Sequence, residues 1–166
     1  MSARALIDSP EFARAGAQLS GSVPVSELPR LADSLYDTDG SLQFELTGGR
    51  DSRQRLRLHM TVAGTIGLQC QRCLGRLDYP VAVRTNLLIL TDQETGDAAE
   101  LDDLDGVPAA AQTDVWSLVE DEVLLAIPLA PRHAEEECSP AVKAAGAPPA
   151  SPFAALARLT QKRSKN

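Results

Sequence analysis

Two long stretches of alternating apolar and polar residues, separated by a short loop, constrain this chain more than any other feature. Between Arg55 and Cys70 the apolar residues fall on even positions, and from Leu77 to Ile89 they fall on odd positions. A period of two is typical of a strand that buries one face. Two such strands predict a long antiparallel hairpin, whose tip carries the motif Cys70-Gln-Arg-Cys73.

The flanking segments predict a sheet packed by helices. A shorter alternating run at 41–46 indicates another strand, and Gly48-Gly49-Arg50-Asp51 indicates a loop after it. Apolar residues at helical spacing predict a helix over 26–36, capped by Ser26, and a second over 113–127, capped by Thr113. We therefore expect an α+β fold in which an antiparallel sheet from residues 41–90, open or closed into a barrel, packs against these helices.

Composition divides the chain into a domain, a linker and a tail. Residues 1–140 predict a single domain with an acidic loop at 91–112, followed by an Ala- and Pro-rich linker at 141–150. Residues 151–166 predict a short helix and a basic tail. The net charge of the chain is −7, and the segment from Thr91 to Gly106 alone holds seven acids and no Lys or Arg. The rest of the chain is therefore nearly neutral.

The three cysteines and one of the two histidines form a candidate metal site. The spacing of Cys70 and Cys73 lets two thiolates face one ion, and Gly75 is expected to allow a tight turn after them. His133 and Cys138 follow the second helix, where Pro128 and Pro131 favour an extended chain. Three thiols and one imidazole suit tetrahedral zinc. The alternative is three reduced thiols that pack as small hydrophobic side chains.

The chain shows none of the sequence patterns expected of a secreted protein, a membrane protein or an enzyme. The N-terminus has no apolar signal-peptide core, the longest apolar run is too short to span a bilayer, and the odd number of cysteines fits a reducing compartment. There is no phosphate-binding glycine loop, nucleophile elbow or HExxH motif. We expect a cytoplasmic, non-enzymatic protein with no membrane contact and no small-molecule substrate.

The tail has an apolar side and several cations. Phe153, Leu156 and Leu159 fall near one face of its predicted helix, and the cations include Arg158, Lys162 and Arg163. Such a segment after a linker can dock on a partner, fold back on the domain, or remain a solubilising terminus.

Taken together, four segments resemble the YceD family, described as large ribosomal RNA subunit accumulation proteins. They are Cys70 to Leu74, Asp114 to Pro128, Pro131 to Cys138 and Ser151 to Leu159, and they occur in family order. The resemblance implies a role in synthesis, processing or stability of the large-subunit (23S) ribosomal RNA. It implies as partner a pre-ribosomal particle, this RNA or a ribosomal protein, and it carries over no catalytic mechanism.

Two other functions compete with this expectation. One is a zinc-dependent RNA-binding module that contacts RNA through Arg55, Arg57, Arg72 and the tail. The other is a redox sensor that uses the thiols of Cys70 and Cys73. In the leading interpretation, Arg72 and the tail contact a partner.

Overall fold

A computed structural model describes residues 4–90, 105–134 and 137–138 of the chain. Five strands form one sheet in the order β2-β3-β4-β5-β6. The strands are β2 (Gln18–Pro24), β3 (Ser41–Arg50), β4 (Leu56–Gln69), β5 (Arg76–Leu90) and β6 (Asp105–Pro108). The first four pair antiparallel, whereas β6 pairs parallel with β5. The α+β class is confirmed, and the sheet is open, with β2 and β6 at its edges.

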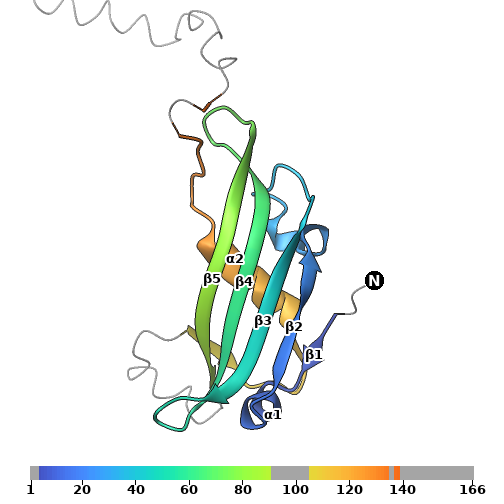
Figure 1. Ribbon diagram of the computed structural model, residues 1–166, viewed down its shortest axis with the longest axis vertical. Coiled ribbons are helices and arrows are strands. Elements are labelled where there is room, and N and C mark those ends of the chain that lie inside the picture. The colour runs from blue at the N-terminus through green and yellow to red at the C-terminus, as the bar shows by residue number, and fades with distance from the viewer. Residues whose placement is uncertain (1–3, 91–104, 135–136, 139–166) are drawn as a thin grey trace, which may run out of the picture.

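The predicted hairpin is the longest feature of the described residues (Figure 1). Strands β4 and β5 pair without a break from Arg57↔Leu88 to Gln69↔Arg76. The helix α2 (Val115–Ala126) crosses behind the long strands in Figure 1 and covers one face of the sheet. That face is apolar because the alternating positions bury Leu58, Met60, Val62, Ile66 and Leu68.

The prediction of a helix over 26–36 is wrong. The structure has two 3₁₀ turns there, Val25–Glu27 and Pro29–Leu31. Pro29 lacks an N–H and disfavours a helical conformation at Leu28, which adopts φ −111° and ψ 76°. The apolar spacing was nevertheless informative, because Leu28 and Leu31 are buried. The chain then adds to the free side of β4 near the hairpin tip, where the N–H of Tyr36 donates to the carbonyl of Gly67 at 2.8 Å.

Two predicted loops contain strand residues. Strand β3 continues through Gly48 and Gly49 to Arg50. Gly48 allows close packing rather than a turn, because it lies against the backbone of α1 (Ser9–Arg14), where a Cβ would overlap the carbonyl oxygen of Phe12. Within 91–112, residues 105–108 form β6, whose parallel partner β5 precedes it in the chain. The helix α1 was not predicted, although Asp8 caps it by accepting from the N–H of Glu11 at 2.8 Å.

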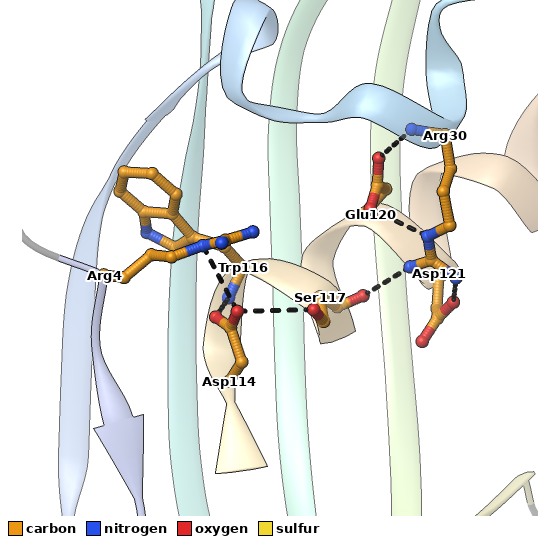
Figure 2. A network of polar contacts seen from close by, with 7 residues as sticks. All are labelled: Arg4, Arg30, Asp114, Trp116, Ser117, Glu120 and Asp121. Carbon is orange, nitrogen blue, oxygen red and sulfur yellow. Dashed lines mark hydrogen bonds and ion pairs between the residues drawn. The ribbon is translucent and has the colours of Figure 1, made fainter.

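The start of α2 differs from the prediction by one residue. Asp114, not Thr113, caps the helix by accepting from the N–H of Trp116 at 3.0 Å. Arg4 pairs with the same carboxylate at 3.2 Å (Figure 2). Just before it, β7 (Thr113–Asp114) pairs with β1 (Leu6–Ile7). These contacts attach the N-terminal segment to the first turn of the helix.

An arginine clamp holds the 3₁₀ turns against α2. The backbone N–H and Nε of Arg30 donate to Glu120 at 2.6 and 2.8 Å, and Nη1 donates to Asp121 at 2.6 Å (Figure 2). These bonds raise the pKa of Arg30, with the bond to Glu120 the largest cause. Glu120 is buried although it is charged. Glu122, two residues further along α2, is buried as well.

Candidate metal centre

The hairpin tip forms a compact knuckle around Cys70. The N–H of Cys70 donates to the carbonyl of Gly75, and the N–H of Leu74 donates to the carbonyl of Cys70, both at 2.9 Å. Leu74 takes the left-handed conformation, with φ 58°, so the tight turn is made one residue before the predicted Gly75. A Cβ on Gly75 would lie 3.4 Å from the Sγ of Cys73, so the glycine leaves space beside this thiol.

The segment after α2 returns to this knuckle. Pro131 is buried, and its carbonyl accepts from the N–H of Gln71 at 2.8 Å. This contact carries His133 and Cys138 to the hairpin tip, although they lie about sixty residues downstream. The structure therefore brings together all four residues that the sequence singled out as metal ligands.

The four ligand atoms have the spacing of a tetrahedral site. All lie within 4.8 Å of one another. The Sγ atoms of Cys70 and Cys138 are 3.9 Å apart, and Nδ1 of His133 lies 3.4 Å from the Sγ of Cys73 and 3.8 Å from that of Cys138. Tetrahedral zinc needs about 3.8 Å between two sulfurs and about 3.6 Å between sulfur and nitrogen. The donor set and its size both fit zinc.

The orientation of His133 is fixed by a bond on its other nitrogen. Its Nε2 lies 2.8 Å from the carbonyl oxygen of Arg76, the first residue of β5. Because a carbonyl only accepts, Nε2 carries the proton and the neutral ring presents the Nδ1 lone pair to the thiols. A second bond of this kind is usual for metal-binding histidines. The bond to the Arg76 carbonyl is also the largest cause of the raised pKa of His133.

The surroundings of Cys70 favour its thiolate form. Burial raises the pKa of its thiol, but hydrogen bonds from the backbone N–H groups of Cys73, His133 and Arg72 outweigh burial. The net effect lowers the pKa of Cys70 from 9.0 to about 5. Burial has the larger influence at Cys138, whose pKa is raised. A thiolate is the form of cysteine that binds metal.

Arg72 connects the two halves of the cluster. Its Nε donates to the Sγ of Cys138 at 2.9 Å, and Nη2 donates to the carbonyls of His133 and Ala134, each at 3.1 Å. Sequence reasoning placed Arg72 on a partner surface and did not identify this positioning contact. Its place inside the CxxC motif was the one signal that pointed to it.

Arg76 supports the cluster in a second way. Its Nε pairs with Asp37 at 2.8 Å and its Nη2 with Asp78 at 3.2 Å. The guanidinium lies over Gly67, where a Cβ would come within 2.8 Å of its Nε. The side chain thus links the end of the hairpin to the 34–37 segment, while the Arg76 carbonyl orients His133. No sequence pattern identified this residue.

The remaining predicted contact residues lie outside the described part of the chain. This applies to the linker 141–150 and to Phe153, Leu156, Arg158, Leu159, Lys162 and Arg163. Among the described helices, none is long and apolar enough to cross a membrane.

Comparisons with known proteins agree with the resemblance found in the sequence. The family model described as Large ribosomal RNA subunit accumulation protein YceD matches residues 58–160, which include all four cluster residues. A protein of the same name from Haemophilus influenzae is 28% identical over 151 residues, covering 86% of this chain and 87% of the relative. No solved structure matches this one. Since the family model spans more than half of the chain, this protein belongs to the YceD family.

Proposed function

We propose that this protein is a non-enzymatic, cytoplasmic ribosome-biogenesis factor that supports synthesis, processing or stability of large-subunit (23S) ribosomal RNA. The family match and the name of the Haemophilus influenzae relative support this role. The partner proposed is a pre-ribosomal particle, its RNA or a ribosomal protein. Neither a membrane nor a small-molecule substrate takes part.

We further propose that Cys70, Cys73, His133 and Cys138 hold a structural zinc ion. The observation that supports this most strongly is the convergence of three sulfurs and one imidazole nitrogen within 4.8 Å. Bound zinc would supply a crosslink between the hairpin tip and the segment after α2. A fully ligated zinc ion of this kind contributes to folding and leaves no position for a substrate.

Under this proposal the tail supplies partner contacts. Phe153, Leu156 and Leu159 provide an apolar side, and Arg158, Lys162 and Arg163 provide cations. Arg72, at the exposed knuckle, supplies a separate partner contact while it holds the second half of the cluster.

Elemental analysis and sedimentation test the two parts of this proposal separately. Full-length protein purified without an affinity metal should contain about one zinc per chain, with its three thiols protected. In a sucrose gradient of cell lysate it should travel with large-subunit precursors. Deleting 151–166 should leave the melting temperature unchanged and weaken this association.

The results that would oppose each part are distinct. Absence of zinc with three reactive thiols would remove the metal site, and sedimentation only with free protein would remove the ribosomal role. A large drop in melting temperature after tail deletion would show that the tail packs on the domain. Loss of RNA binding on chelation would favour the zinc-dependent RNA module, and a reversible Cys70–Cys73 disulfide that alters partner affinity would favour the redox sensor.

A further inference from the structure

One face of the sheet carries no covering segment among the described residues. Helices α1 and α2 lie on the other face, and in Figure 1 the uncovered face points toward the viewer. Most of its outward positions are polar or small, including Gln43, Glu45, Thr61 and Ala63, and the exception is Leu88, which lies opposite Arg57 and is buried. No aromatic side chain occupies an outward position on β3, β4 or β5, because Phe44 and Tyr79 alternate to the inner face.

The end of this face opposite the knuckle is basic. The β3–β4 connection and the adjoining strand residues hold Arg50, Arg53, Arg55 and Arg57, and Arg84 lies on β5 opposite Thr61. Against these five arginines stand two acids, Glu45 on β3 and Asp51 in the connection. This excess of positive charge is unusual in a chain whose net charge is −7.

Two of these arginines are available for a ligand. Asp51 pairs with Arg55 at 2.7 Å. Arg57 and Arg84 are exposed, and no carboxylate of the described residues pairs with either of them. Between them lie His59 and Asn86, joined at 3.1 Å. The Arg57 side chain lies beside Gly49, which has no side chain to cover it.

We propose that this basic face, defined by Arg57, His59, Arg84 and Asn86, binds the sugar–phosphate backbone of RNA. Exposed arginines and polar donors on a flat strand surface suit phosphate and 2′-hydroxyl groups. The lack of aromatic side chains provides no platform for stacking bases, so binding is independent of sequence. The inference deepens the proposed function, on which it rests, by naming the partner and the surface.

The basic face is separate from the metal centre. Cys70 lies thirteen positions after Arg57, which corresponds to about 43 Å along a strand. RNA binding on this face therefore does not depend on zinc, in contrast to the zinc-dependent module. Binding is weak, because six acids of 91–104 lie in sequence between Leu90 and Asp105, which join the described fold near this end.

Fluorescence anisotropy with labelled oligouridine tests this surface on the full-length protein. The double variant Arg57→Gln/Arg84→Gln should bind roughly tenfold more weakly at low salt, because each lost phosphate contact weakens binding of every sequence alike. The slope of log affinity against log salt should fall by about 1.4, or about 0.7 per contact on a single strand. The control Arg14→Gln/Arg132→Gln removes the same charge from other surfaces and should bind as wild type does. Chelation should change neither wild type nor control.

Three results, obtained with the variants, the chelator and the competitor, would overturn the proposal. These are equal losses in both double variants, loss of binding on chelation, and displacement of the RNA by polyglutamate as readily as by unlabelled oligouridine, which would indicate an acidic protein partner. Wild type that sediments with large-subunit precursors but does not bind RNA would also exclude the surface while leaving the proposed function intact. Failure of wild type to sediment with those precursors would instead remove the proposed function.

Discussion

Arg72 has a geometry that lysine cannot reproduce. One planar guanidinium donates both to the thiol of Cys138 and to two consecutive carbonyls, those of His133 and Ala134. A lysine ammonium is a point charge on a flexible stem and cannot hold these three acceptors together. The residue within the CxxC motif is thereby expected to position the ligand that comes from the far segment.

The variant Arg72→Lys should therefore weaken zinc binding by about tenfold, the lower end of what losing an outer-shell partner costs. Competition with a chromogenic chelator measures this change. Arg132→Lys is the control, because Arg132 is exposed, is next to His133 in the sequence, and its side chain bonds to none of the four cluster residues. Equal zinc affinity in both variants, with weaker particle association only for Arg72→Lys, would show that Arg72 acts on a partner instead.

At the scale of the element, α2 buries two glutamates, of which Glu120 is bonded to an arginine and Glu122 is destabilised as a charged group by its burial. Glu120 accepts two bonds from Arg30, which compensate its carboxylate for lost water. Glu122 has a raised pKa because burial disfavours its charged form, and the charges of Asp105 and Asp121 add to this effect. A raised carboxyl pKa contributes stability at low pH that is lost as the pH rises through the folded pKa.

Glutamine substitutions at the two positions should consequently have opposite effects at neutral pH. Glu122→Gln should raise the free energy of unfolding by on the order of 1 kcal/mol, because a neutral amide costs less to bury. That gain should shrink as the pH falls toward about 4.3, the usual glutamate pKa. Glu120→Gln should lower it by about 1–3 kcal/mol, because the new amide opposes the Nε of Arg30. Urea unfolding across pH measures both, and shifts of the same sign would contradict this account.

The elements that the sequence predicted are those whose signal is local. The β4–β5 hairpin is encoded by its own alternation, and the CxxC at its tip follows from that. The helix over 26–36 failed because Pro29 outweighed the apolar spacing. Strand β6 and the Arg30 clamp were not predictable, since each depends on a partner distant in sequence. Within the metal centre, the four ligands could be predicted from the sequence. The roles of Arg72 and of the Arg76 carbonyl could not, because they depend on contacts between distant segments.

For the whole molecule, the two ends of the hairpin are stabilised by different contacts. The basic end is surrounded by β3, α1 and the covered core, while the knuckle projects beyond them (Figure 1). At the knuckle the described supports are the 34–37 segment and the residues returning from α2. Metal binding is therefore expected to stabilise one end of the molecule far more than the other.

Chelation of the full-length protein should consequently loosen the knuckle and spare the sheet. Hydrogen exchange should accelerate at the N–H groups of Gln71 and Leu74, whose acceptors are the Pro131 and Cys70 carbonyls. Exchange between Leu58 and Val62 should stay slow, because this stretch of β4 is paired with β3 on one side and with β5 on the other. The variant Cys138→Ser should reproduce the pattern without chelator, by removing one of four ligands. Uniform acceleration along β4 would mean that the cluster holds the entire sheet, whereas an unchanged knuckle would mean that the 34–37 segment and the Pro131 contact suffice without metal.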